Sequence, residues 1–189
     1  MSQEPTKKMS EKASKEMSKS PDGLESLVLD RGLSAGDDYI TIAPGAIREV
    51  LTKLRENGFT QLVFITCVDH LNRPDDRVPF TGGAEIPRFE LVYQVRNSDA
   101  RSLLRVRAFL PESEPRVQSV HDLYGPANWD ERETWDLFGV EFEGHPDLTR
   151  ILLPEDWVGH PLRRDYPVGG EAVEFSEDHE EWQTTPQQA

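Results

Sequence analysis

The sequence predicts an α+β fold: a compact two-layer domain with helices on a mixed β-sheet, followed by an extended C-terminal arm. The first observation is a stripe of apolar residues at helical spacing between positions 47 and 54. The second is a pair of segments, 89–95 and 103–109, in which apolar and polar residues alternate as in strands with one wet face. One helix, then strands, then further helices favours the α+β class. After Gly144 the chain contains prolines and charge–aromatic clusters without periodicity, which indicates an arm.

The elements follow in chain order. Residues 1–23 are rich in Ser, Lys and Glu, a composition that predicts a mobile polar segment. The core domain is expected over 24–143. Within it, residues 39–42 have the composition of a short strand, Pro44 suits the first turn of the next helix, and Gly58 suits its end.

The middle of the chain predicts a buried strand at 62–68 and an irregular loop at 70–87. Residues 97–100 suit the turn of a hairpin. Alternation in its second strand predicts that Leu104, Val106 and Ala108 share one face while Arg105 and Arg107 share the other. Cys67 lies inside the apolar run, so we interpret it as a small buried hydrophobe.

Two further helices are expected before the arm. The first is short and covers 117–124. The second begins near Asn128, where Glu131 completes a capping box, and ends at Gly139. The arm is expected over 144–168.

Composition excludes several classes of protein. The net charge of −14 argues against a nucleic-acid partner, and seven acids without Lys or Arg follow from Asp165 onward, so residues 169–189 form an acidic tail. The single cysteine excludes an internal disulfide and a cluster held by four thiolates of this chain. No stretch approaches the roughly 20 apolar residues of a membrane span. The N-terminus lacks the apolar core of a secretory signal.

The sequence contains few candidates for a catalytic or ligand-binding motif. Phosphate-binding loops, dinucleotide fingerprints and nucleophile elbows are absent from the sequence. The strongest metal candidate combines His121 and Asp122 with His145 and Asp147, but nothing there fixes a ligand spacing. An independent metal-dependent hydrolase at these residues is therefore a remote alternative. The Asp69–His70 pair is interpreted as a loop anchor.

Residues 129–166 differ from the rest of the chain because they concentrate tryptophan, proline and charges of both signs. One interpretation is a core helix followed by a strapped tail. The other is an interface arm, because Trp, Tyr and Arg anchor many protein–protein contacts and proline limits the entropy lost on docking. Arg132 and Asp136 lie one helical turn apart and are expected to pair. Glu131, Trp135 and Phe138 occupy another face.

Several motifs occur here in a fixed order: 131–133 (Glu-Arg-Glu), 136–139 (Asp-Leu-Phe-Gly), 142–146 (Phe-Glu-Gly-His-Pro), 150–152 (Arg-Ile-Leu), 154–157 (Pro-Glu-Asp-Trp), 159–163 (Gly-His-Pro-Leu-Arg) and 165–167 (Asp-Tyr-Pro). With them the sequence resembles the 30-kilodalton subunit of respiratory complex I, from about residue 39 to 167. It departs from the family at Thr149, where many members have a basic residue, and at Arg164, which is commonly Lys.

The resemblance implies a cofactor-free scaffold subunit in the quinone module of a proton-translocating NADH:quinone oxidoreductase. FMN, iron–sulfur clusters and quinone are then expected in partner subunits, chiefly the large quinone-site subunit and its iron–sulfur neighbour. The location is the cytoplasmic side of a bacterial plasma membrane, reached only indirectly. No catalytic, cofactor or metal residue is expected. The predicted interface residues are Glu131, Arg132, Glu133, Asp136, His145, Pro146, Arg150, Trp157, His160, Pro161, Arg163, Arg164, Asp165 and Tyr166. The near alternative is the equivalent subunit of a membrane-bound hydrogenase or a ferredoxin-dependent complex.

Overall fold

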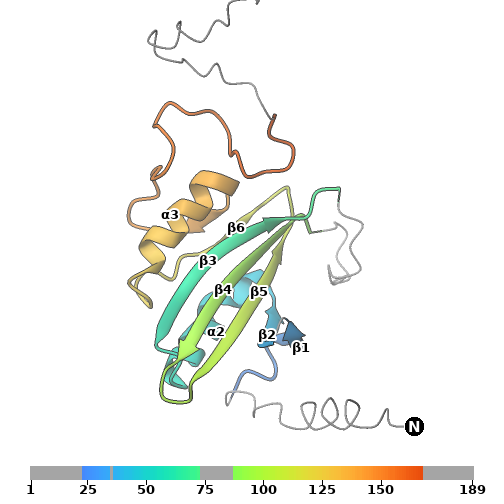
Figure 1. Ribbon diagram of the computed structural model, residues 1–189, viewed down its shortest axis with the longest axis vertical. Coiled ribbons are helices and arrows are strands. Elements are labelled where there is room, and N and C mark those ends of the chain that lie inside the picture. The colour runs from blue at the N-terminus through green and yellow to red at the C-terminus, as the bar shows by residue number, and fades with distance from the viewer. Residues whose placement is uncertain (1–22, 35, 73–86, 168–189) are drawn as a thin grey trace, which may run out of the picture.

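The computed structural model describes residues 23–34, 36–72 and 87–167 (Figure 1). The polar segment predicted over 1–23, apart from Gly23, lies outside the described residues. So do most of the loop predicted over 70–87 and all of the acidic tail at 169–189.

A five-stranded sheet forms the centre of the molecule, in the order β1-β2-β5-β4-β3. Its strands are β1 (Val28–Ser34), β2 (Asp37–Ile42), β3 (Gln61–Asp69), β4 (Phe89–Asn97) and β5 (Ser102–Leu110). Strands β2 and β5 are parallel, and the other neighbours are antiparallel. The sheet is therefore mixed, and the predicted α+β fold class is confirmed.

Strands β4 and β5 form the predicted hairpin. In β5, Leu104, Val106 and Ala108 are buried in the core, whereas Arg105 and Arg107 lie on the opposite face. The guanidinium of Arg107 covers the rings of Tyr39 and Phe109 at 4.9 and 5.2 Å from their centroids. Long basic side chains on this face therefore shield the aromatic rings beside them.

The prediction of a buried strand at 62–68 is wrong in one respect. The strand exists as β3, but it is an edge strand and buries only one face. Val63 is 50% exposed and Phe64 37% exposed, while Ile65 and Cys67 face the core. Burial raises the pKa of the Cys67 thiol far above its usual range, so the interpretation of this residue as a buried hydrophobe is confirmed.

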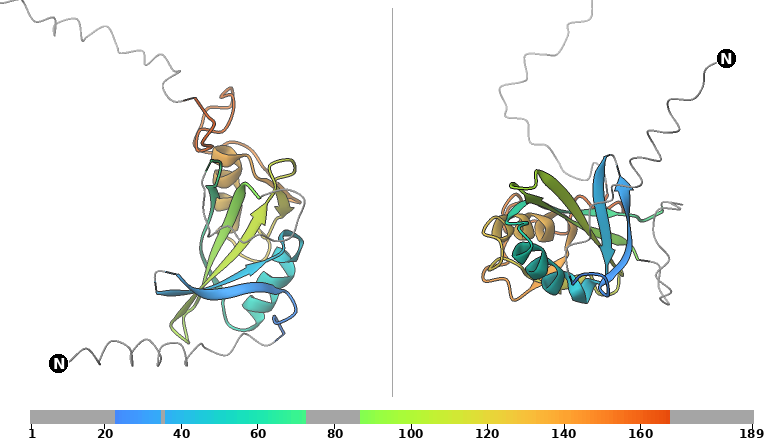
Figure 2. Two further views of the ribbon diagram at one scale, coloured as in Figure 1. Left: turned by 90° about the vertical axis from the view of Figure 1, so that its right-hand side faces the viewer. Right: turned by 90° about the horizontal axis from the view of Figure 1, so that it is seen from below.

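Strand β1 is not predicted by the sequence pattern. It pairs with β2 along one edge of the sheet, at the end of the molecule opposite the arm (Figure 2). Two of its middle residues, Asp30 and Gly32, are poor strand formers. Gly32 leaves room for the Tyr39 ring, because a Cβ there would lie 2.9 Å from the Tyr39 hydroxyl.

Pro44 was expected in the first turn of a helix, and it begins a 3₁₀ turn, η1 (Pro44–Ala46), which leads directly into helix α2 (Ile47–Glu56). Its apolar stripe is fully buried against the sheet, and each such side chain contributes about 1.5–3 kcal/mol by burial. The four residues of the stripe are Ile47, Val50, Leu51 and Leu54. Gly58 has a φ of +91° just after the helix, where a left-handed residue ends the last turn.

The prediction of a short helix over 117–124 is wrong. The chain there forms β6 (Arg116–Gln118), which pairs in parallel with β7 (Glu141–Glu143). Val117 and Val120 are both buried, and their i, i+3 spacing imitates a helical stripe. A parallel partner that lies more than 20 positions downstream cannot be recognised from a local pattern.

Helix α3 (Ala127–Phe138) lies along the β3 edge (Figure 1). Its Asp130 carboxylate accepts the Ile65 amide hydrogen at 3.1 Å, which satisfies a backbone donor of the edge strand. Gly139 ends the helix with a φ of +75°, as predicted. The predicted capping box is wrong because Pro126 is the N-cap and the Glu131 carboxylate bonds to Ser119 and Val120 instead.

Candidate interface arm

The arm, residues 144–167 of the described chain, has neither helix nor strand and proceeds through repeated turns. It passes over the C-terminal end of α3 and returns to the start of β4, where Asp165 contacts Arg88 (Figure 1). Its fixed course therefore depends on contacts with the domain beneath it.

Asp136 is the central anchor of the arm, with no exposed surface. Its Oδ2 accepts the amide hydrogens of Ile151, Leu152 and Leu153 at 3.1, 2.9 and 3.0 Å, and its Oδ1 accepts a bond from Arg150 at 2.5 Å. Burial alone raises the pKa of this carboxyl, but the bonds from the Leu153 and Leu152 amides and from Arg150 outweigh it, so the pKa is lowered. One ionised carboxylate thus fixes four consecutive residues of the arm.

The pairing predicted between Arg132 and Asp136 is wrong. Arg150, from the arm, takes the Asp136 carboxylate, and it also donates to the carbonyls of Trp157 at 2.8 Å and Gly159 at 3.2 Å. Arg132 donates instead to the Thr149 hydroxyl at 2.9 Å and to the Arg150 carbonyl at 3.0 Å. Both guanidiniums tie the arm to α3, so neither is held ready for an outside carboxylate.

The end of α3 is packed closely against the last part of the arm. The Arg163 side chain donates to the Phe138 carbonyl at 2.6 Å, and His160 Nδ1 lies 2.9 Å from the Asp136 carbonyl. A Cβ at Gly139 would clash with the Arg163 guanidinium and would lie 2.6 Å from the His160 ring. Gly139 therefore serves both the left-handed cap and the close approach of the arm.

The far end of the arm is held by an ion cluster. Arg88 is 5% exposed and donates two bonds each to Asp69 and Asp165, at 2.6–3.0 Å, and a further bond to Glu112. Asp69 also accepts the amide hydrogens of Leu71 and Arg164, both at 2.9 Å. The interpretation of Asp69 as a loop anchor is confirmed. Sequence reasoning did not single out Arg88, because its acidic partners lie 19, 24 and 77 positions away.

Several apolar side chains of the arm and the adjoining helix are exposed, beside exposed charged residues such as Asp147, Glu155 and Asp156. Val158 is 85% exposed, Leu152 60%, Leu162 51% and Trp129, on α3, 60%. The backbone around each of the first three is anchored near the C-terminal end of α3: the Leu152 amide bonds to Asp136, the Leu162 amide bonds to Leu137, and Arg150, which pairs with Asp136, bonds to the carbonyls on both sides of Val158. We call Leu152, Val158 and Leu162, together with Trp129, the apolar patch. It is not among the predicted interface residues.

The remaining predicted interface residues are spread over both sides of the arm. Glu131 is buried in the domain, whereas Glu133, Pro146 and Arg164 are exposed. Those that lie partly covered between the arm and the domain are His145, Trp157, Pro161 and Tyr166.

The residues of the candidate metal site have other hydrogen-bond partners. Asp122 forms a two-bond pair with Arg48 at 2.5 and 2.8 Å. His145 Nε2 lies 3.1 Å from the Asn128 carbonyl, and its Nδ1 accepts the Asp147 amide hydrogen. Among residues 23–34, 36–72 and 87–167, no three or more His, Cys, Asp and Glu side chains are grouped to hold a metal ion.

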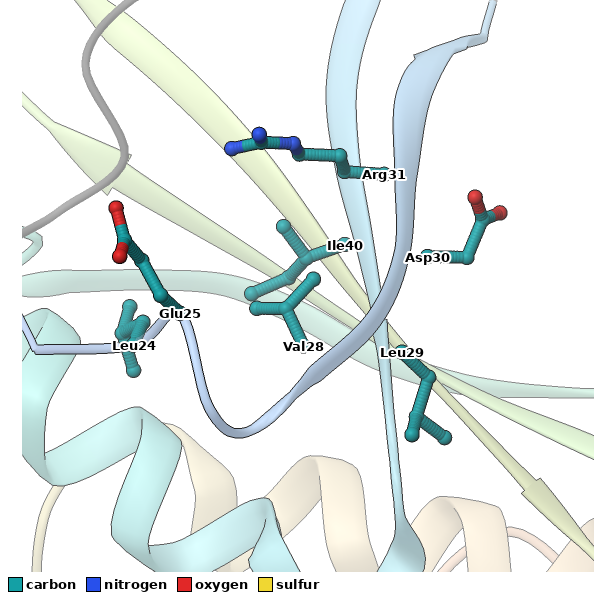
Figure 3. Close-up of a pocket in the computed structure, with 7 residues that line it drawn as sticks. All are labelled: Leu24, Glu25, Val28, Leu29, Asp30, Arg31 and Ile40. Carbon is teal, nitrogen blue, oxygen red and sulfur yellow. The ribbon is translucent and has the colours of Figure 1, made fainter.

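A cavity of about 510 Å³ lies at the other end of the molecule, between the 24–27 turn and β1. Figure 3 shows Val28 and Ile40 side by side in it, while Leu29 and Asp30 point away from them. None of the predicted site residues lines this cavity. In the described part of the chain, no helix is long and apolar enough to cross a membrane.

Comparison with known proteins decides the family. The family model described as respiratory-chain NADH dehydrogenase, 30 Kd subunit, matches residues 40–172. The chain belongs to this family. The resemblance noted in the sequence is thereby confirmed, over nearly the same residues.

Individual members of the 30 Kd subunit family agree. An NADH-quinone oxidoreductase subunit of Salinispora tropica is 39% identical over 157 residues, which cover 82% of this chain and 58% of that protein. This chain thus spans less than two thirds of that relative. NADH-quinone oxidoreductase subunit 5 of Thermus thermophilus is 40% identical over 154 residues, covering 78% of this chain and 69% of the relative.

Solved structures share the fold. The trypsin-resistant fragment (1-134) of Nqo5 is 34% identical, with a TM-score of 0.53, and the match covers 63% of this chain and 89% of the fragment. A chain of the membrane-bound sulfane sulfur reductase, an archaeal respiratory membrane complex, has a TM-score of 0.61 over 85% of this chain and 86% of that one. At 23% identity the second match shows the fold alone.

Proposed function

We propose that this chain is a docking subunit of a proton-translocating NADH:quinone oxidoreductase and that the arm presents its contact surface. The partners are the large quinone-site subunit and its iron–sulfur neighbour. FMN, iron–sulfur clusters and quinone reside in the partner subunits, and this chain carries no activity of its own. It is a peripheral subunit on the cytoplasmic side of the membrane.

The observation that carries the proposal is the orientation of the arm's side chains. Asp136, Arg150 and Arg163 are satisfied inside the chain, so their charges need no partner. Meanwhile Val158 and Leu152 project from the surface that they stabilise. Exposed apolar residues on a rigid polar frame are typical of protein–protein contact surfaces. In this proposal the charged interface residues position the arm, and the apolar patch makes the contact.

The test is purification of the tagged full chain from its host, followed by identification of the subunits that accompany it. Triple substitution of Leu152, Val158 and Leu162 by Ser is expected to reduce recovery of the quinone-site and iron–sulfur subunits at least about tenfold, which corresponds to about 1.4 kcal/mol of binding. The stability of the isolated chain is expected to change by less than about 0.5 kcal/mol, because these side chains are exposed.

A matched control is available at the opposite end of the sheet. Leu29 and Leu33 are 60% and 54% exposed, and replacing both by Ser should leave subunit recovery unchanged. Equal recovery with the triple variant would overturn the role of the patch. Recovery of hydrogenase or ferredoxin-linked subunits in place of NADH-linked ones would instead assign the chain to a related membrane complex.

A further inference from the structure

A second cluster of polar side chains lies where α3 meets the loop after β6, apart from the anchors of the arm. Glu131 has no exposed surface. Its Oε1 accepts the Val120 amide hydrogen at 2.7 Å, and its Oε2 lies 2.5 Å from the Ser119 hydroxyl. The same hydroxyl lies 3.0 Å from His121 Nδ1. A continuous chain of hydrogen bonds therefore joins a buried carboxyl to a partly exposed imidazole.

We propose that Glu131, Ser119 and His121 form a proton relay through which the buried carboxyl exchanges its proton with solvent. The consequence is a pH-dependent attachment of α3 to the loop after β6. A hydroxyl can donate one bond and accept another at once, and an imidazole nitrogen can be donor or acceptor. These are the properties that an intermediate group in a relay requires.

Two bonding patterns satisfy the same geometry. When Glu131 is protonated, its O–H donates to Ser119, and the Ser119 O–H donates to the unprotonated Nδ1 of His121. When Glu131 is ionised, the Ser119 O–H donates to the carboxylate, and Nδ1–H donates to Ser119. To pass from the first pattern to the second, Glu131 gives its proton to Ser119 as Ser119 gives its own to Nδ1. The resulting imidazolium then releases its Nε2 proton to water.

The surroundings of Glu131 place this exchange near neutral pH. Burial raises the pKa of Glu131 to about 7, against the bonds from Ser119 and Val120. The other titratable or charged groups facing this cluster come from the loop, from α3, α2 and β4, and from the start of the arm: Asp122, Asp130, Arg48, Tyr93 and His145.

His145 is too constrained to replace His121 in the relay. Its Nε2 lies 3.9 Å from the Glu131 carboxylate but donates to the Asn128 carbonyl at 3.1 Å, and its Nδ1 accepts the Asp147 amide hydrogen at 3.1 Å. Burial also lowers the pKa of His145. Both ring nitrogens of neutral His145 therefore already have hydrogen-bond partners.

The sign of the effect on stability follows from the raised pKa. A carboxyl with a higher pKa in the folded chain than in the unfolded chain binds more protons when folded. The stabilisation from neutral Glu131 is complete below the ordinary value of 4.5 and is lost as pH rises through about 7. Protonated Glu131 thus holds α3 more tightly than ionised Glu131.

The test follows the His121 imidazole and the Glu131 carboxyl by NMR in the full chain, from about pH 4.5 to about pH 8. The relay predicts that the His121 ring resonances follow the protonation of Glu131, because Ser119 joins the two groups by hydrogen bonds. Glu131→Gln should abolish this response. Ser119→Ala keeps the bond from the Val120 amide to Glu131 but should also abolish the response at His121.

Glu133→Gln provides the control, because Glu133 is an exposed glutamate on the same helix, and it should preserve the response of His121 to Glu131. Thermal unfolding gives an independent measurement: the melting temperature of the native chain should fall from about pH 5 to about pH 8, and this fall should be smaller in Glu131→Gln. The same pH dependence of the His121 resonances in the native chain and in Ser119→Ala would overturn the relay. That comparison remains decisive if Glu131→Gln does not fold.

Discussion

The core domain and the arm are held in place by different kinds of contact. The core buries apolar side chains such as Tyr93, Val106 and Leu51 and places arginines outside. The arm directs several polar groups inward, toward Asp136 and Arg88, and leaves Leu152, Val158 and Leu162 exposed together with charged residues such as Glu155 and Asp156. The core domain is stabilised by the burial of many apolar side chains, each of which contributes a small part. The arm is fixed by a few polar contacts that are individually strong. The contrast predicts that single polar substitutions disturb the arm far more than its small buried area would indicate.

The largest effect is expected at Asp136. Asp136→Asn removes the charge that accepts bonds from Arg150 and from three amides. Arg150 is only 13% exposed in its side chain, so its charge would be left without compensation, at a cost of about 3–5 kcal/mol in the free energy of unfolding. Urea unfolding of the full chain measures this. Asp156→Asn, at an exposed position of the same arm, is the control, and an equal effect of the two variants would refute the anchor.

An intermediate effect is expected at Gly139, and the chain supplies its own control. Gly139 and Gly144 have φ angles of +75° and +81°, so alanine at either costs about 1–2 kcal/mol for the left-handed conformation. A Cβ at Gly139 would also meet Arg163 and His160, whereas nothing lies within 4 Å of a Cβ at Gly144. Gly139→Ala should therefore be more destabilising by roughly 1–3 kcal/mol. Thermal unfolding of both variants tests this, and equal losses would show that the arm does not press on the end of α3.

The same contrast explains what the sequence could and could not predict. Apolar periodicity revealed α2 and the β4–β5 hairpin because the packing of these elements repeats along the chain. It failed at β6, where Val117 and Val120 fit a helix but the backbone pairs with a distant strand. Family motifs located the arm, yet local spacing assigned Asp136 to Arg132 when Arg150, 14 positions away, is its partner. Contacts that join remote residues, such as Asp69, Arg88 and Asp165, leave no periodic signal.

The apolar patch was missed for a related reason. Leu152, Val158 and Leu162 look like ordinary core residues in a sequence, yet they are exposed in the structure. The inward hydrogen bonds of Arg150 and Arg163 show that these two charged side chains are held within the chain. Density of charge is therefore a poor guide to which side chains of this arm are free to contact a partner.

The smallest effect is expected at the far end of the arm, where the ionic contact is half exposed. Asp165 has a side chain that is 50% exposed, and Asp69 remains paired with Arg88 when Asp165 is changed. Asp165→Asn should therefore lower the free energy of unfolding by no more than about 1 kcal/mol, and the loss should shrink at high salt, unlike the loss at Asp136. Urea unfolding at low and high ionic strength measures the difference between the two anchors.

The stability contributed by the Asp165 contact should also depend on pH, in a direction that its pKa determines. Its hydrogen bond to Arg88 lowers the pKa of Asp165 below the ordinary value of 3.8. Because the unfolded chain then binds protons more readily, the stabilisation is present above about pH 4 and is lost as pH falls through the folded-state pKa. Native chain and Asp165→Asn should thus converge in stability on acidification, while Asp156→Asn follows the native chain throughout. A constant gap between native and Asp165→Asn at all pH values would mean that the ionised carboxylate is not what holds this end of the arm.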